Sequence, residues 1–144
     1  MSNEIRKKHA EVNQYCTFYV GDYYLGIEIS FVQEVLKEQN ISYVPLASNN
    51  VRGLINLRGK IITAIDMWSM LKIEKKSDSE MNMVVRTSNG TFSFVVEKIG
   101  EILEVSKDKY QSIPSHINDY MKTMLTGVYQ LEDELLLLVN LNQI

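Results

Sequence analysis

The sequence lacks most features that mark exported, membrane-spanning or disulfide-stabilised proteins. It has one cysteine, Cys16, which excludes an internal disulfide and a multi-cysteine metal site and fits a reducing compartment. Its longest unbroken apolar run, Leu135 to Val139, has five residues, whereas roughly 20 are needed to cross a bilayer. The first residues contain no apolar signal-peptide segment. We therefore predict a cytoplasmic protein that does not insert directly into a membrane.

An excess of positive charge is also missing. Fifteen basic and 18 acidic side chains give a formal net charge of -3, so no global positive field would hold a polyanion, and nucleic acid is not an expected partner. Low-complexity sequence is confined to the polar stretch Glu74 to Glu80, which we interpret as a linker. With 144 residues, 45% of them apolar, the chain is long enough to bury a core without metal or disulfide support.

Motifs of catalysis and metal binding are absent from the sequence. There is no HExxH, CxxC, GxGxxG or GxxxxGK[ST] pattern, and the only histidines, His9 and His116, cannot form a zinc site unaided. Cys16 lies in an apolar stretch, which favours a small core residue over a nucleophile. We predict a protein that is not an enzyme and has no cofactor or metal. An enzyme whose residues meet only in three dimensions remains the alternative.

The apolar residues alternate mostly with a period of two, which predicts an all-β fold. A first hairpin is expected from Tyr15 to Ile29, with its turn at Gly21-Asp22. A second is expected from Met83 to Val96, where the Asn-Gly pair of Ser88-Asn89-Gly90 predicts a type I′ turn.

The two hairpins begin two halves of similar pattern. Four spacings agree: 24 residues separate Gly21 from Pro45 and Gly90 from Pro114, and 13 separate Gly53 from Asp66 and Gly127 from Asn140. Each half ends in two strands and an Asp or Asn suited to cap a helical turn. A duplicated small barrel, with the two copies packed on each other, explains this pattern. Chance similarity between unrelated hairpins is the alternative.

The duplication predicts the domain organisation. We expect a flexible leader at residues 1–14, a first barrel subdomain at 15–79 with a linker at 74–80, and a second subdomain at 80–144. Ser30 and Gln33 have capping-box spacing, so a helical turn is predicted there. The sequence leaves open whether Trp68 is buried or exposed.

The two halves differ in charge at equivalent turns. Arg58-Gly59-Lys60 forms a basic hairpin tip, and its counterpart Glu132-Asp133-Glu134 is acidic. Such a difference suits head-to-tail association, in which two different surfaces meet and close into rings. Solvated turns, where charge is well tolerated, are the alternative.

Three segments together resemble the CheW family of bacterial chemotaxis adaptors, over nearly all of residues 15–144. They are VRGLINLRGKIITAID (Val51 to Asp66), IEISFVQEVL (Ile27 to Leu36) and LTGVYQLEDELLLLVN (Leu125 to Asn140). The pattern G-x-x-N-L-R-G at Gly53 to Gly59 is the most specific piece. The resemblance implies two intertwined five-stranded SH3-like barrels and a non-catalytic protein. Its role would be to couple the cytoplasmic tip of methyl-accepting chemoreceptors to the histidine kinase CheA, recruited to membrane-bound receptor arrays.

The resemblance also implies two sets of contact residues. The receptor surface would include Val32, Glu34, Gly53 and Arg58, where a helical tip meets an apolar floor and Arg58 makes a two-pronged polar contact. The regulatory domain of the kinase would contact two segments and so close mixed rings. These kinase-binding residues are Ile41, Tyr43, Val44, Pro45, Gln111, Ser115 and His116.

Two rival functions remain. The first is a CheW-like module of a larger signalling protein, either a kinase regulatory domain or an adaptor fused to a receiver. The second is a nucleic-acid-binding pair of barrels, which would require clustered basic residues and exposed stacking aromatics, and the acidic charge balance argues against it.

Overall fold

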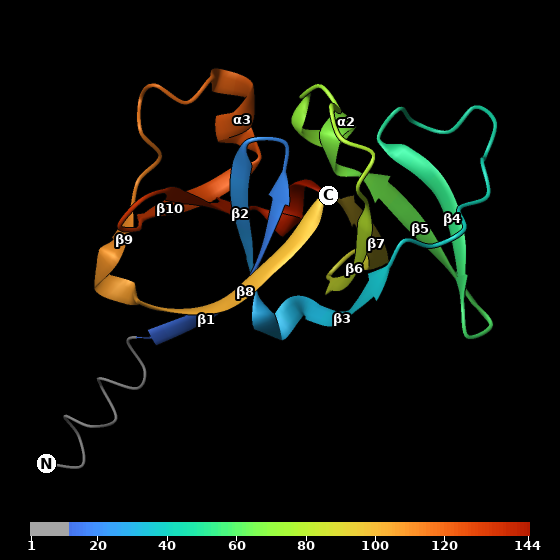
Figure 1. The fold of residues 1–144 in the computed structure, drawn as a ribbon, viewed down its shortest axis with the longest axis horizontal. Coiled ribbons are helices and arrows are strands. Elements are labelled where there is room, and N and C mark those ends of the chain that lie inside the picture. Colours follow the sequence, from blue (N-terminus) through green and yellow to red (C-terminus); the bar gives the residue numbers. More distant parts are fainter. Residues whose placement is uncertain (1–11) are drawn as a thin grey trace, which may run out of the picture.

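The structure, a computed structural model, describes residues 12–144. Two β-sheets lie side by side along the long axis, and two short helices, α2 and α3, lie along one side of the molecule (Figure 1). In chain order the elements are β1 (Val12–Val20), β2 (Tyr23–Glu28), η1 (Ile29–Phe31), β3 (Val32–Lys37), β4 (Val51–Leu57), β5 (Lys60–Asp66), α2 (Met67–Leu71), β6 (Met81–Thr87), β7 (Gly90–Val96), β8 (Lys98–Ser106), η2 (Lys107–Lys109), β9 (Tyr110–Gln111), α3 (Asp119–Thr123), β10 (Leu125–Gln130), β11 (Leu135–Val139) and η3 (Leu141–Gln143). No helix in this part of the chain has the length and apolar character needed to span a bilayer.

Each sheet is built from strands of both halves of the sequence. The six-stranded sheet has the order β8-β1-β2-β11-β10-β9, and the five-stranded sheet has the order β3-β6-β7-β5-β4. The strand that follows each hairpin crosses to the other sheet, so that β3 pairs with β6 and β8 pairs with β1. The predicted all-β fold with two intertwined halves is confirmed. One sheet has a sixth strand because the two-residue β9 adds to its edge.

The two exchanged strand pairs have the same register. Phe18 pairs with Ile99, and Val85 pairs with Val32. Both members of one pair differ from their counterparts by 67 residues (85 − 18 and 99 − 32), and a bulge follows each pair. An equal register at both crossings is what an internal pseudo-two-fold axis requires. It supports a duplicated origin for the two halves.

The hairpin alignment that we expected from the glycines is wrong by two residues. Gly21 is the first residue of its turn, whereas Gly90 follows the turn residues Ser88 and Asn89 and pairs with Thr87. The structural offset at the hairpins is therefore 67 residues, not the 69 that separate the two glycines. The predicted type I′ turn is also wrong, because Gly90 has a positive φ of 127° and Asn89 does not.

The domain boundaries follow the sequence repeat and not the sheets. Residue 80 separates the two halves of the repeat, but each sheet crosses that boundary, so the division at 79/80 stays a prediction about the repeat. Strand β1 begins at Val12, so residues 12–14, expected in the leader, lie in a strand. His9 and the rest of the leader lie outside the described residues.

Helix α2 begins as predicted at Asp66, whose carboxylate accepts a hydrogen bond from the Ser69 amide at 3.1 Å. At the equivalent position the Asn140 side chain accepts from the Asn142 amide at 3.0 Å and begins η3. A helical turn is present at η1, but no described side chain caps it, because Ser30 lies inside the turn and Glu28 occupies the N-cap position. The predicted capping box is therefore wrong.

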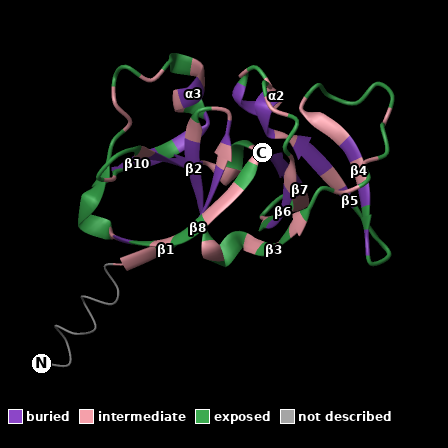
Figure 2. Cartoon of the chain, viewed as in Figure 1, coloured by how far each residue is buried: buried purple, intermediate pink, exposed green. Residues whose placement is uncertain are grey.

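The core lies inside and between the two sheets, and α2 is part of it (Figure 2). Trp68 is 2% exposed, which answers the question that the sequence left open. Cys16 is 5% exposed, and burial raises the pKa of its thiol, so the predicted core role of this residue is confirmed.

Candidate functional site

The side chains of Arg58 and Glu34 meet across the open ends of the five-stranded sheet. Glu34 lies on β3, at one edge, and Arg58 lies in the turn between β4 and β5, at the other. The guanidinium donates two hydrogen bonds, from Nη1 to Oε2 at 2.9 Å and from Nη2 to Oε1 at 2.6 Å. These bonds lower the pKa of Glu34 and raise that of Arg58. The pair joins the two sheet edges and stays accessible, because the Arg58 side chain is 68% exposed.

The local sequence of the turn places Arg58 at its tip. Arg58 and Gly59 have φ values of 52° and 85°, and they connect Leu57 to Lys60, which pair with each other. Two positive φ angles in a two-residue loop define a type I′ hairpin turn. The Gly59 amide donates to Asn56 Oδ1 at 2.9 Å and holds the turn from inside. In the N-L-R-G pattern, Asn56 and Gly59 thus support the conformation that presents Arg58.

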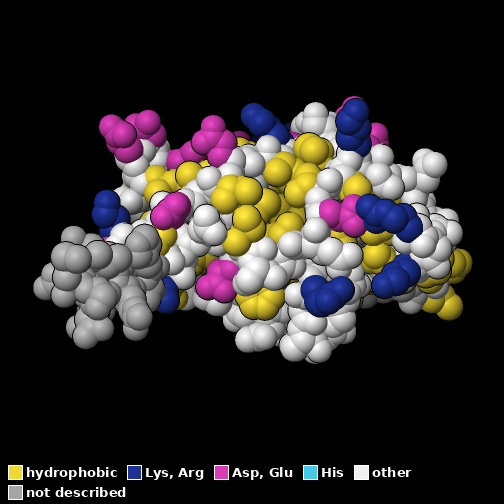
Figure 3. All heavy atoms as spheres, turned by 90° about the horizontal axis from the view of Figure 1, so that it is seen from below, with side chains coloured by type: hydrophobic (Ala, Val, Ile, Leu, Met, Phe, Trp, Pro, Cys, Tyr) yellow, Lys and Arg dark blue, Asp and Glu magenta, His cyan; other side chains and the backbone are white. Residues whose placement is uncertain are grey.

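Exposed apolar side chains lie beside this ion pair. Val32 is half-buried and packs against the core, while Phe31 and Val35, its neighbours on η1 and β3, are each 39% exposed. Ile102 on β8 is 56% exposed, and it is the counterpart of Val35 at the offset of 67 residues. Figure 3 views the side along which β1, β8 and β3 run, and shows hydrophobic side chains gathered in its middle, with oppositely charged side chains at one end. An apolar surface with a polar pair at its margin is suited to a helical partner.

Gly53 is a seat for the neighbouring chain segment. It is buried, with a φ of 156°, and a Cβ on it would lie 2.2 Å from the carbonyl oxygen of Ser42. Ser42 and Leu54 exchange two backbone hydrogen bonds directly over this point, at 2.8 and 2.9 Å. Of the four predicted receptor-binding residues, Gly53 thus lies under the backbone of residues 41–42, whereas Glu34 and Arg58 are brought together and Val32 lies on the same strand as Glu34.

The first predicted kinase-binding segment is an apolar loop anchored at one point. Ile41 is half-buried against the core, and the Ser42 bridge fixes the residue beside it. Beyond this anchor Tyr43 is 79% exposed, Val44 is half-buried, and Pro45 is exposed. Leu46, which was not predicted as a contact residue, is fully exposed with a φ of 64°. Its position directly after Pro45 in an uncharged stretch was the available signal.

The second predicted segment is the counterpart of the first. Gln111 on β9 pairs with Val128 as Ser42 pairs with Leu54, with offsets of 69 and 74 residues that match the spacings in the sequence. Gln111, Ser115 and His116 are all exposed. The two segments lie at opposite ends of the long axis (Figure 1). One molecule can therefore present both at the same time.

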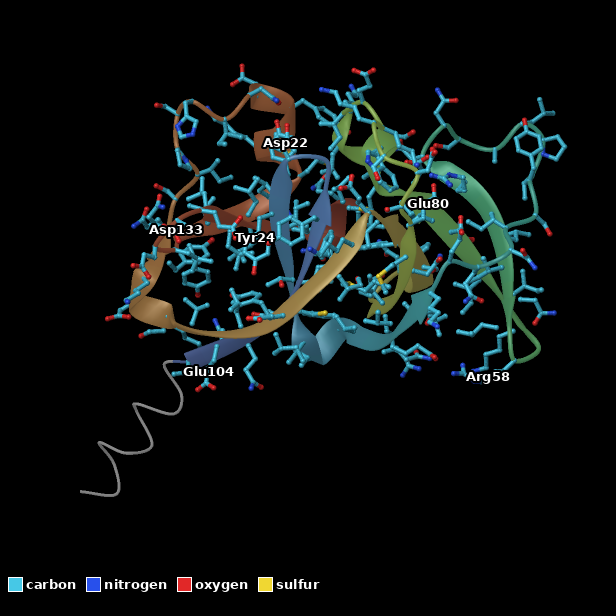
Figure 4. All side chains as sticks on the ribbon, in the orientation of Figure 1. Asp22, Tyr24, Arg58, Glu80, Glu104 and Asp133 are labelled. Atoms are coloured by element: carbon cyan, nitrogen blue, oxygen red, sulfur yellow. The ribbon has the colours of Figure 1, made fainter. Side chains whose placement is uncertain are left out.

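The basic and acidic tips also lie at opposite ends, as the labelled Arg58 and Asp133 show (Figure 4). The charges are not equally free. Arg58 is bound to Glu34, and Arg52 contacts Asp66 at 3.0 Å and Glu80 at 2.9 Å. Two of the three basic residues in the acid-free stretch therefore have structural partners. Within residues 12–144, no three His, Cys, Asp or Glu side chains gather as metal ligands would.

Comparison with known proteins agrees with the fold and the predicted resemblance. A family model described as a CheW-like domain matches residues 14–144. Chemotaxis protein CheW of Helicobacter pylori is 25% identical over 141 residues, which cover 96% of this chain and 85% of that protein. Chemotaxis protein CheW of Treponema pallidum is 23% identical over 137 residues, which cover 91% and 81%. The crystal structure of the scaffolding protein TtCheW from Thermoanaerobacter tengcongensis is 23% identical and has a similar fold, with a TM-score of 0.81 over 90% of this chain and 89% of that one.

Proposed function

The chain belongs to the CheW-like domain family of chemotaxis proteins, and from this premise we propose that it couples the cytoplasmic tip of chemoreceptors to the histidine kinase CheA without catalysis. The observation that carries the proposal is the Glu34–Arg58 pair beside the exposed apolar surface of η1 and β3. The names of the relatives and the scaffolding role of TtCheW support it.

The proposed receptor site has an apolar floor and a charged margin. A receptor tip is a helical hairpin, and a helix docks most stably where its apolar side chains leave water while a polar group sets its register. Phe31, Val32 and Val35 provide the apolar contact area. Arg58 provides a planar group with donors left over after its two bonds to Glu34. Gly53 acts from below, through the segment that it seats.

The receptor site is tested by replacing Arg58 with alanine. We expect Arg58→Ala to weaken binding of a receptor cytoplasmic fragment by about tenfold, because a well-oriented two-pronged contact at an interface contributes on the order of 1–2 kcal/mol. Lys60→Ala in the same turn is the matched control, since Lys60 is exposed and makes no ion pair within residues 12–144. Binding is measured by titration calorimetry, with circular dichroism to show that both variants fold. Equal affinities for Arg58→Ala and the wild type would contradict the site.

The proposed kinase contacts lie at the two ends of the molecule. A protein with one contact for the same kinase domain at each end can alternate with that domain in a closed ring. The loop containing Tyr43 and Leu46 exposes the apolar anchors that such contacts require, and the segment from Gln111 to His116 is its counterpart.

This two-ended arrangement predicts how assembly fails. We expect Tyr43→Ala to stop assembly with the kinase regulatory domain at small complexes, because the segment at the other end still binds one copy. Multi-angle light scattering separates this outcome from a complete loss of binding. Glu132→Ala, on an exposed turn outside both segments, serves as the control and should assemble as the wild type does. Rings of unchanged size with Tyr43→Ala would exclude the first loop as a contact.

A further inference from the structure

A pocket of about 560 Å³ opens in the six-stranded sheet, beside the turn between β6 and β7. Its size is within the range of roughly 300–1,000 Å³ that holds small molecules. The wall is mainly aromatic and aliphatic, from Tyr15, Ile27, Phe31, Tyr110, Tyr129 and Leu138. The rings of Tyr15 and Tyr110 stand edge-on to Tyr129, with centroids at 5.5 and 5.8 Å. The pocket thus offers several aromatic surfaces to a planar occupant.

The other half of the molecule shows what fills the equivalent place. The Asp66 amide donates to the Asn50 carbonyl at 2.8 Å, and 74 residues later the Asn140 amide donates to the Met124 carbonyl at the same distance. The same offset makes Trp68 the counterpart of Asn142. Trp68 is 2% exposed in the core, whereas Asn142 is exposed and lines the pocket. An indole therefore occupies in one half the place that is open in the other.

The pocket also contains a polar group without a partner. Tyr129 is 1% exposed, and its hydroxyl makes no hydrogen bond to any residue in 12–144. A buried hydroxyl left unpaired costs on the order of 1–3 kcal/mol, so a ligand that bonds to it recovers part of this cost. Burial, and then the neighbouring Tyr129, raise the pKa of Tyr15, so the Tyr15 hydroxyl on the same wall stays protonated at neutral pH.

We propose that this pocket binds a planar aromatic small molecule of about the size of indole, whose single N–H or O–H group pairs with the Tyr129 hydroxyl. The ring lies among the side chains of Tyr15, Tyr110 and Tyr129, in the space that corresponds to the Trp68 side chain. The site is independent of the residues proposed to contact receptor and kinase.

The proposal is tested with indole as the probe and the full chain labelled with ¹⁵N. Titration followed by NMR is expected to give saturable shifts at the amides that line the pocket, including Gly26, Thr126 and Asn140. Tyr129→Phe removes only the hydroxyl and is expected to weaken binding by about fivefold to tenfold, the usual effect of one hydrogen bond. Unchanged affinity for Tyr129→Phe, shifts scattered over the surface, or shifts that do not saturate would overturn the proposal.

A second variant places the ligand group on the chain itself. Asn142→Trp puts an indole at the position equivalent to Trp68 and is expected to abolish indole binding and to show blue-shifted emission from the added tryptophan. Asn49→Trp, on an exposed loop of the other half, is the matched control and should bind indole normally and emit as a solvated tryptophan. Full binding by Asn142→Trp would overturn the proposal. So would indole binding that appears only after residues 1–11 are deleted, because the chain itself would then cover the pocket.

Discussion

Replacing Trp68 with alanine is expected to lower the free energy of unfolding by about 3–5 kcal/mol, the usual cost of removing a large buried aromatic side chain. Trp68 is the only tryptophan and lies on α2 with Met67, Met70 and Leu71, which are also buried. The ammonium group of Lys75, in the connection to β6, lies 4.9 Å from the centroid of its ring. Loss of the indole would thus leave a cavity and release the connection between the two halves.

Urea denaturation followed by far-UV circular dichroism measures this effect, since the variant has no tryptophan fluorescence. Because domains of this size are commonly stable by about 5–15 kcal/mol, the loss would be a large part of the total. Asn142→Ala is the control at the equivalent position and is expected to change stability by less than about 0.5 kcal/mol, because Asn142 is exposed. Similar losses at positions 68 and 142 would contradict the view that only one of the two equivalent places is filled from within the chain.

Local features of this fold could be predicted from the sequence because they depend on neighbouring residues. Alternation of apolar residues indicated the two hairpins, and Asp66 and Asn140 were recognised as helix caps from their chemistry. The equal spacings indicated the repeat. Its alignment at the hairpins was wrong because a turn glycine marks a conformation and not a register, and Gly21 and Gly90 occupy different turn positions.

Features that depend on closure of the sheets could not be predicted locally. The exchange of β3 and β8 is decided by which sheet edges are free, and the sequence pattern of a strand is the same in either partner. The contact between Glu34 and Arg58 exists only because the opposite edges of one sheet approach each other. The family resemblance named both residues, but it did not indicate that they bind each other. The pocket near Tyr129 was missed because it is a difference between the halves, whereas the repeat was recognised from what they share.

The second large effect is expected at Gly53. In Gly53→Ala the new Cβ would lie 2.2 Å from the Ser42 carbonyl oxygen and 2.7 Å from the Ile41 side chain. The backbone cannot accept this contact, so the two hydrogen bonds between Ser42 and Leu54 should break and the loop that carries Tyr43 should lose its anchor. We expect binding of the kinase regulatory domain through this loop to fall by at least about tenfold. Hydrogen exchange should show lost protection at the Ser42 and Leu54 amides.

Gly90→Ala separates this steric effect from backbone strain. Gly90 also has a positive φ, 127°, but nothing lies within 4 Å of the place that a Cβ would take there, so its substitution brings the conformational cost of about 1–3 kcal/mol without a clash. The two variants should lose comparable stability from strain, while only Gly53→Ala should lose the kinase contact. If Gly53→Ala lost receptor binding alone and kept the Ser42 and Leu54 amides protected, Gly53 would contact the receptor directly. The position of Gly53 beneath residues 41–42 favours the first outcome, because a partner can reach this glycine only after that segment has moved.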